Sequence, residues 1–410
     1  MAYISILVLV ITIAVSYFTG INAGIVGISF AYLFGRFCVR LSVKQIITGF
    51  PVSTVFALMG MTFLFGIARD NGTLTNIART IIRLANGKTI RIPFMFFLLC
   101  TLLAAMGPGP VVITALVAPI AMATAKVQNI PDLLMAISVC SGSISGGLSG
   151  ISSSGIIAQT LGKEQGVENY TPVFLSCMLI SSILFLLFFV LFGGIKLKDV
   201  PSAGTGGRKI TYDRDQKITL AVILLTILLI AIFGFDTGST AFLGGLVLLL
   251  LRTVDQKEAI KGIAWPTILL ISGMGILINV VNLSGGISAM TALLSKAMTS
   301  KTAAPLICVI AGMMSSVSSA SGVVMPTLIP TIGELSRALG SDVSMSGLLA
   351  GIVVGAHVVT ASPLSTLGAM CLSSANEKTD KQKMFTQMII IGFSSVVIAS
   401  VLGGLGLFYL

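Results

Sequence analysis

Four clusters of hydroxyl, glycine and proline residues lie inside long apolar stretches of the sequence. They are GPGP (107–110), SGSISGGLSGISSSG (141–155), SSVSSASG (315–322) and HVVTASPLST (357–366). Such residues interrupt helices, and irregular backbone inside a membrane is tolerated only where protein or a water-filled cavity covers it. Interrupted helices expose N–H groups that suit a carboxylate, whereas free carbonyl and hydroxyl oxygens suit a small hard cation such as sodium.

We therefore expect the four clusters to bind a substrate and an ion. The candidate residues are Gly107, Pro108, Gly109, Pro110, Ser149, Ser152, Ser153, Ser154, Ser318, Ser319, Ser321, Gly322, Thr360, Ser362, Pro363, Ser365 and Thr366. Small residues in membrane helices often serve close packing instead, and for SGSISGGLSG (141–150) that explanation is equally good. Packing does not require adjacent prolines, nor breaks at matching positions in both halves of the chain.

Two further polar residues are weaker candidates. His357 is the only histidine and precedes one of the breaks. It could take a proton or contact a substrate, or it could be neutral and hydrogen-bonded inside the protein. The neutral role is favoured because its counterpart in the first half is the apolar Ile144. Asn279 lies near the end of a predicted helix.

The composition predicts an all-α polytopic membrane protein. The chain has 410 residues, of which 55% are hydrophobic and only 10% charged, whereas soluble domains carry about a quarter charged residues. The 14 acidic residues fall mostly in predicted loops or at helix ends, which disfavours a carboxylate proton relay, a sodium/proton antiporter and a cationic substrate. The six cysteines are scattered singly, so disulfides and a metal site are not expected.

Internal similarity predicts two repeats. Residues 58–74 align with 271–287, 106–120 with 317–331, and 149–162 with 362–375, at offsets of 211 to 213 positions. We expect a first repeat over 1–195, with a hairpin at about 91–128 and a broken helix at about 131–162. A linker (196–216) follows. The second repeat spans 217–410, with a hairpin at about 303–338 and a broken helix at about 344–375.

An inverted arrangement of these repeats is expected, because five membrane crossings and one re-entrant hairpin in each half turn the second half over. Of the 25 lysines and arginines, 18 fall on one side of this topology, and that bias predicts the cytoplasmic side. The other seven are Arg36, Arg40, Lys44, Lys163, Lys296, Lys301 and Arg337. Both termini and the entrance of the second hairpin would then lie outside, with the first hairpin entering from the cytoplasm. The net charge of +11 is thus interpreted as a topology signal and not as nucleic-acid binding.

Two stretches resemble a known group of carriers. A small-residue tip followed by an apolar helix with proline, VVITALVAPIAMA (111–123) and again VVMPTLIPTI (323–332), resembles the ion-transporter superfamily. Within it, the chain is similar to malonate/dicarboxylate carriers and divalent-anion:sodium symporters. The segment ISILVLVITIAVSYFTGINAGIVGISFAYLFG (4–35) resembles the start of the malonate/dicarboxylate carriers.

The resemblance implies a homodimer in which each protomer has a scaffold domain and a transport domain that moves by an elevator-type displacement. In the symporters each hairpin tip carries a Ser-Asn-Thr motif that contacts sodium and the substrate carboxylate. Here Gly107-Pro108-Gly109-Pro110 and Ser318-Ser319-Ala320-Ser321 occupy the tips, and neither contains asparagine. The binding contacts are therefore expected to differ from those of the symporters.

These observations predict a secondary active transporter that imports a small dicarboxylate of the malonate or succinate kind. Sodium is the expected coupling ion, and no other cofactor, metal or nucleic-acid partner is expected. The expected location is a bacterial-type cytoplasmic membrane. The alternatives are a proton-coupled or exchange carrier for a monocarboxylate or sulfonate, which would use His357, and, less favoured, a sodium/proton antiporter or a channel. No nucleophile–base pair, HExxH motif or phosphate loop occurs, so an enzyme is not expected.

Overall fold

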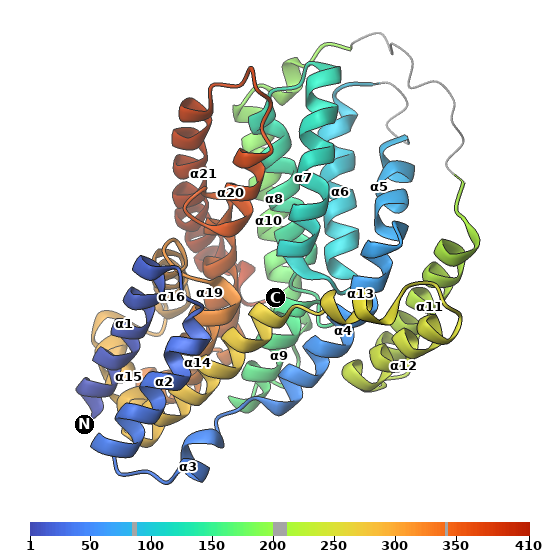
Figure 1. The fold of residues 1–410 in the computed structure, drawn as a ribbon. Helices are drawn as coiled ribbons and strands as arrows, with labels where there is room; N and C mark the ends of the chain where they lie inside the picture. The colour runs from blue at the N-terminus through green and yellow to red at the C-terminus, as the bar shows by residue number, and fades with distance from the viewer. Residues whose placement is uncertain (84–87, 200–210, 341–342) are drawn as a thin grey trace.

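The computed structural model describes residues 1–410 except 84–87, 200–210 and 341–342, and the described residues form helices and no β-strand (Figure 1). Residues 200–210 of the predicted linker therefore lie outside the described residues. The first half contains α1 (Ala2–Thr19), α2 (Ala23–Leu33), η1 (Phe34–Cys38), α3 (Val43–Ile47), α4 (Val52–Asp70), α5 (Thr73–Arg83), α6 (Arg91–Ala105), α7 (Gly109–Gln128), α8 (Asp132–Gly146), α9 (Ser153–Glu164), α10 (Thr171–Leu191) and η2 (Gly194–Lys196).

The second half has a similar sequence of elements. It contains α11 (Arg214–Ala231), α12 (Thr237–Leu250), α13 (Gln256–Lys261), α14 (Trp265–Leu283), α15 (Gly286–Ala297), α16 (Ala303–Ser315), η3 (Ala320–Val324), α17 (Met325–Leu328), η4 (Ile329–Thr331), α18 (Ile332–Leu339), α19 (Met345–Val358), η5 (Val359–Ala361), α20 (Thr366–Ser373), α21 (Lys381–Leu402) and η6 (Gly403–Leu407).

Many of these helices suit a lipid environment. Among the described residues, seven helices are long and apolar enough to cross a membrane, and a bent pair adds one more. Their outer faces carry exposed apolar side chains, such as Phe18, Val190 and Leu405, which water would not favour but lipid does. The prediction of a polytopic, all-helical membrane protein is therefore confirmed for the part of the chain described.

Two helical hairpins interrupt the apolar segments. Residues 106–108 join α6 to α7, and residues 316–319 join α16 to the helices from η3 to α18, which bend away by 120°. Gly107 and Gly109 have φ of 148° and 81°, conformations that other residues rarely adopt. We name residues 106–110 tip 1 and residues 316–322 tip 2.

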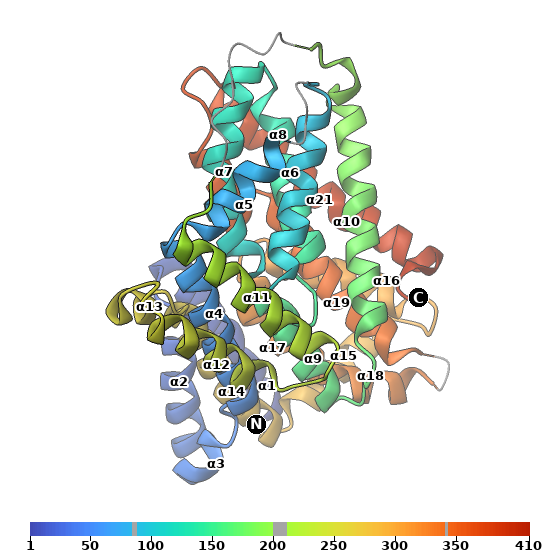
Figure 2. The same ribbon diagram turned by 90° about the vertical axis from the view of Figure 1, so that its right-hand side faces the viewer.

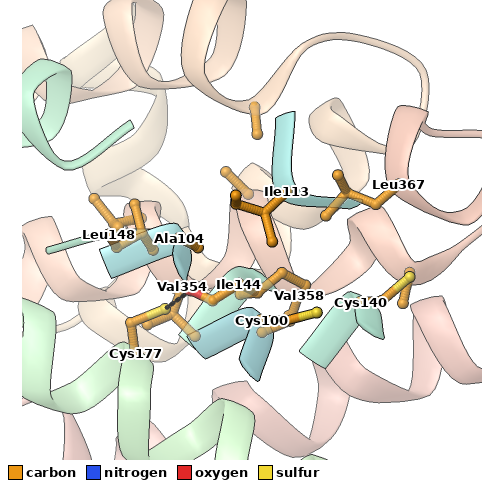
Figure 3. Close-up of a cluster of buried hydrophobic side chains, with 14 of the residues drawn as sticks. Cys100, Ala104, Ile113, Cys140, Ile144, Leu148, Cys177, Val354, Val358 and Leu367 are labelled. Carbon is orange, nitrogen blue, oxygen red and sulfur yellow. Dashed lines mark hydrogen bonds between the residues drawn. The ribbon is translucent and has the colours of Figure 1, made fainter. Parts of the chain in front are cut away.

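One helical segment in each half of the chain is interrupted by a short stretch that is not α-helical. α8 and α9 are separated by residues 147–152, and α19 and α20 by η5 and residues 362–365. We name residues 147–154 break 1 and residues 362–366 break 2. Their helices share one apolar core with α6, α7 and α10, in which Cys100, Ile113, Cys140, Cys177 and Val354 meet (Figure 3).

Helices also cross between the halves in matched pairs. α2 packs on α14, and α12 packs on α4. Where α2 crosses α14, a Cβ on Gly273 would lie 1.9 Å from the carbonyl oxygen of Gly24. Where α12 crosses α4, a Cβ on Gly60 would lie 2.5 Å from the carbonyl oxygen of Gly238. Only glycine permits such close backbone approach. Gly60 and Gly273 stand 213 positions apart, which is the offset found in the sequence.

Different helices form the two ends of the molecule. In both views α1, α2, α3 and α14 lie towards the end that holds the N-terminus, and the α7–α8 turn lies at the opposite end (Figures 1 and 2). α13, which precedes α14, lies between these ends. The α7–α8 turn therefore extends to the end of the molecule opposite the N-terminus, whereas α9 of the first broken helix lies nearer the N-terminal end.

Candidate functional site

Tip 1 and the residue before it are held against break 1 through their backbone carbonyl oxygens, which accept from one amide and two serine hydroxyls of break 1. The amide of Ser153 donates to the carbonyl oxygen of Gly107 over 3.0 Å, and the hydroxyl of Ser149 donates to that of Ala105 over 2.5 Å. The Ser153 hydroxyl reaches the Pro108 carbonyl oxygen at 3.3 Å. A Cβ on Gly109 would lie 2.0 Å from the Ser153 Oγ, so this contact requires glycine.

A side chain of break 1 forms hydrogen bonds with some of the backbone groups of the same segment. Ser152 is the N-cap of α9, and its hydroxyl accepts from the amide of Gly155 over 3.1 Å. The same hydroxyl donates to the carbonyl oxygen of Gly147. Pro110 of tip 1 packs on the Cα of Gly147, where a Cβ would lie 2.3 Å from the proline Cγ. Tip 1 and break 1 therefore form one closely packed unit.

Tip 2 reaches across to the first half through side chains. The hydroxyls of Ser321 and Ser154 lie 2.8 Å apart, and the Ser321 hydroxyl lies 3.2 Å from Nε2 of His357. Ser319 caps η3 by accepting from the amide of Gly322 over 3.1 Å. All four predicted clusters are thus brought together, because tip 1 and tip 2 both contact break 1 and tip 2 also contacts His357 of the fourth cluster.

His357 lies behind tip 2, near the end of α19. Its Nδ1 is 2.8 Å from the carbonyl oxygen of Val353, and the side chain is only 2% exposed. The hydroxyl of Thr360 donates to the His357 carbonyl oxygen over 2.5 Å. The imidazole therefore connects tip 2 to the region just before break 2.

Break 2 makes only local hydrogen bonds among the described residues. The amide of Leu364 donates to the Ser362 hydroxyl over 3.3 Å, and Pro363 is half-buried. Ser365 is the N-cap of α20 but makes no side-chain capping bond, and Thr366 is exposed. The amides at the start of α20 thus lack the side-chain cap that Ser152 provides for α9.

Asn279 lies apart from these clusters. Its amide nitrogen donates to the Gln45 carbonyl oxygen of α3 over 2.8 Å. The residue lines a cavity of about 440 Å3, which we name the wide pocket. The wide pocket lies between α14, the segment before α4, the end of α9 and the helices that follow tip 2. Asn279 therefore belongs to this pocket and to the packing of α3.

A second, smaller pocket is lined mostly by residues that correspond, by the repeat offset, to residues of the wide pocket. It has a volume of about 120 Å3, and we name it the narrow pocket. Eight of its ten lining residues stand 213 positions from residues of the wide pocket. Thr62, Phe65, Gly66, Arg69, Lys261, Gly262, Ile263 and Ala264 correspond to Gly275, Ile278, Asn279, Asn282, Thr48, Gly49, Phe50 and Pro51. The remaining lining residues, Pro108 and Val112, come from tip 1 and α7.

One buried cluster was not anticipated from the sequence. Asp132, at the start of α8, accepts from the amide and side chain of Asn376 over 2.7 and 2.5 Å and from the Thr379 hydroxyl over 2.6 Å. Asn376 also donates to the Met122 carbonyl oxygen of α7 over 3.0 Å. Asp132 follows Pro131 as helix-starting acids often do, but no sequence signal pairs it with residues 244 positions away. This cluster connects α7 and α8 to the segment after α20.

No charged side chain in the described part of the chain is hydrogen-bonded to either tip, to break 1 or to His357. The two ion pairs found there, Arg69–Asp70 and Lys261–Glu258, involve Arg69 and Lys261, which line the narrow pocket together with Pro108 of tip 1. The cluster consists of hydroxyls, one imidazole and backbone groups. Hydroxyl and carbonyl oxygens of this kind are suited to small hard cations and to polar groups that donate hydrogen bonds.

Helical hairpins, broken helices and an uncharged polar site surrounded by apolar faces together define a membrane carrier. Comparison with known families agrees. Residues 1–147 match the family described as the dicarboxylate carrier protein MatC N-terminus, and residues 236–410 match the CitMHS citrate transporter family. No curated protein matches the chain. The two family matches support membership in an ion-transporter family like that of the malonate/dicarboxylate carriers. The predicted resemblance is thereby confirmed, and the chain is a carrier and not an enzyme.

Proposed function

We propose that this carrier imports a small dicarboxylate of the malonate or succinate kind, coupled to sodium. The observation that carries the proposal is the uncharged polar cluster of Ser154, Ser321 and His357, which joins the two halves. Hydroxyl and carbonyl oxygens are the ligands that sodium accepts without a buried carboxylate. The dicarboxylate and citrate carriers of the matched families support a carboxylate as the substrate.

The substrate carboxylate is proposed to bind at break 2. The N-terminus of a helix attracts anions through its free N–H groups and its dipole. At α9 the Ser152 hydroxyl already occupies one of these groups, whereas at α20 no side chain caps the helix and Thr366 is exposed. Break 2 is therefore the position more open to a carboxylate.

Alternating access is proposed to follow from an inverted repeat and an elevator-type displacement. The matched crossings of α2 on α14 and α12 on α4 support the repeat, as do the two pockets with equivalent walls. The wide and narrow pockets would lie on opposite sides of the membrane and exchange their volumes as the two hairpins and the two broken helices move together. A homodimer in the cell membrane with both termini outside is part of the same proposal.

A second candidate function is a proton-coupled or exchange carrier for a monocarboxylate or sulfonate. The specific observation in its favour is the contact between the Ser321 hydroxyl and Nε2 of His357. Protonation of the imidazole would alter the tip directly. A sodium/proton antiporter or a channel is less favoured, because no charged side chain is hydrogen-bonded to this cluster in the described chain.

Uptake by proteoliposomes tests these alternatives. Labelled malonate and succinate are offered with an inward sodium gradient, with an equal choline gradient, and with a pH gradient alone. We expect uptake that depends on the sodium gradient. Uptake that follows the pH gradient in the absence of sodium would refute the sodium coupling, and no uptake of either dicarboxylate would refute the proposed substrate class.

A further inference from the structure

The tautomer of His357 follows from its two hydrogen-bond partners. Nδ1 lies 2.8 Å from the Val353 carbonyl oxygen, which can only accept, so Nδ1 carries a proton. The imidazole is buried, and no carboxylate is hydrogen-bonded to it in the described chain. A buried charge without a partner is costly, so the ring is neutral. Its Nε2 is then an acceptor.

The direction of the remaining hydrogen bonds follows in turn. A serine hydroxyl has one proton to donate and two lone pairs. Because Nε2 of His357 can only accept, the Ser321 hydroxyl donates its proton to Nε2. The proton between the two serine oxygens, which are 2.8 Å apart, must therefore come from Ser154. Both hydroxyl protons are thus directed away from any ligand.

The consequence is a pair of oxygens that offer lone pairs and no donors. Ser154 retains two free lone pairs, and Ser321 retains one. The pair is 2.8 Å apart, so both oxygens can ligate one small hard cation at the usual distance of about 2.4 Å. A carboxylate would meet only lone pairs there and would be repelled.

We propose that His357 is a positioning residue that fixes the hydrogen-bond polarity of the Ser321–Ser154 pair, so that the two hydroxyls bind sodium and not the substrate carboxylate. The proposal deepens the sodium coupling put forward above and rests on it. It assigns a cation position shared by the two halves, since Ser154 comes from break 1 and Ser321 from tip 2. If a hydrogen-bond donor stood in place of Nε2, Ser321 would accept from it and donate to Ser154. The hydroxyl proton of Ser154 would then be free to point towards the ligand.

In the described chain, no charged group that could stabilise a protonated imidazole is hydrogen-bonded to His357. Among the described elements packed against α19, charged side chains lie only at the ends, namely Asp132 on α8, Lys163 and Glu164 on α9, Glu334 and Arg337 on α18, and Lys381 and Lys383 on α21. Other titratable groups on these elements are the buried thiols Cys140, Cys177 and Cys308. None of them is hydrogen-bonded to the imidazole, whose ring contacts are Val353 and Ser321.

Sodium binding can be measured without knowledge of the substrate. The full-length protein is purified in detergent, and its thermal unfolding is followed while sodium chloride replaces choline chloride at constant ionic strength. A ligand that binds only the folded state raises the unfolding temperature, so the titration gives an apparent sodium affinity. The variants are His357→Leu, His357→Gln and Ser321→Ala. The matched control is Ser395→Ala, which removes a buried hydroxyl from α21 that is bonded only to its own helix.

We expect His357→Leu and Ser321→Ala each to weaken the apparent sodium affinity by about tenfold, the effect of one well-oriented polar contact. His357→Gln should stay within about threefold of the wild type, since its amide oxygen can accept the Ser321 proton. Ser395→Ala should not change the affinity. An unchanged affinity in a folded His357→Leu or Ser321→Ala protein would overturn the proposal, as would the absence of any sodium-specific stabilisation of the wild type.

The outcome is separable from that of the proposed function. Sodium-specific stabilisation that depends on His357, combined with dicarboxylate uptake that ignores the sodium gradient, would uphold the cation position and refute the coupling. Sodium-driven uptake with an affinity insensitive to His357→Leu would uphold the coupling and refute the role assigned to His357.

Discussion

Tip 1 contacts break 1 through its own backbone carbonyl oxygens, which accept from an amide and a hydroxyl of Ser153, whereas tip 2 contacts its neighbours through the side-chain hydroxyl of Ser321. At tip 1 the Gly107 carbonyl oxygen accepts from the Ser153 amide, and Gly109 leaves no room for a Cβ. At tip 2 the Ser321 hydroxyl lies between Ser154 and His357. Equivalent positions in the two halves thus carry different chemistry.

The difference suggests different tasks for the two tips. Tip 1 offers only backbone acceptors and leaves no room for a side chain at Gly109, so it forms a fixed support, and any addition there disturbs the packing. Hydroxyl contacts can be rearranged by a change of one proton or one ligand. We infer that tip 1 mainly shapes the site, whereas tip 2 supplies groups that respond to an ion. The predictions below test this division, beginning with the largest expected effect.

Substitution Gly109→Ala should strongly destabilise the protein. The new Cβ would lie 2.0 Å from the Ser153 Oγ, and φ is 81°. Gly193→Ala is the matched control, because Gly193 has φ of 82° and nothing within 4 Å of a Cβ. Both variants carry the left-handed strain of about 1 kcal/mol, and only Gly109→Ala adds roughly 1–3 kcal/mol of overpacking. Thermal unfolding in detergent measures the difference, and equal losses would contradict the tight fit of tip 1.

Substitution Ser321→Ala should reduce sodium-driven uptake far more than Ser318→Ala. The Ser318 hydroxyl of the same tip donates only to the Met314 carbonyl oxygen, whereas Ser321 bonds to both Ser154 and His357. Loss of one polar contact of a bound ion corresponds to about tenfold in uptake at limiting sodium, and Ser318→Ala should stay within about twofold. Initial rates in proteoliposomes at several sodium concentrations provide the measurement. Similar rates for the two variants would remove the distinction within tip 2.

Much of the helical framework could be predicted from the sequence, because long apolar runs and helix breakers have direct physical meanings. The apolar runs predicted a polytopic membrane protein. The described helices have their breaks at GPGP, at SGISSS (149–154) and at ASPLS (361–365), where glycine, proline and hydroxyl residues are concentrated. The resemblance to dicarboxylate carriers also came from short local patterns, and the family matches confirm it.

The contacts between distant residues could not be predicted in the same way. Nothing in the sequence around Ser154 indicates that its partner is Ser321, 167 positions later. The repeat offset placed Ile144 opposite His357 and therefore gave no reason to associate His357 with tip 2. Asp132 shows the same difficulty, since its partners Asn376 and Thr379 adjoin it only after the two halves pack together. Such pairings depend on the tertiary arrangement and not on local propensity.

Substitution Asp132→Ala should destabilise the packing between the halves at the end opposite the N-terminus. It removes the acceptors of the Asn376 amide, the Asn376 side chain and the Thr379 hydroxyl. Buried donors left without acceptors cost about 1–3 kcal/mol each before relaxation, so we expect a loss of about 3 kcal/mol. Asp132→Asn keeps part of the acceptor set and should lose less. If the comparison of the tips is sound, sodium affinity in Asp132→Asn should stay near that of the wild type, because this cluster has no hydrogen bond to tip 2 among the described residues.

The smallest functional effect is expected from a test of the side from which each tip enters the membrane. Cys38 is exposed, and the other five cysteines are buried. It lies at the end of η1, which we predict to be outside, so a membrane-impermeant maleimide should label it in intact cells without loss of uptake. In a Cys38→Ala protein, Lys198→Cys places a thiol at an exposed position after α10, which we predict to be cytoplasmic and labelled only after permeabilisation. The opposite result would reverse the topology, so that tip 1 would enter from outside and tip 2 from the cytoplasm, and the ion-responsive tip would face the other compartment.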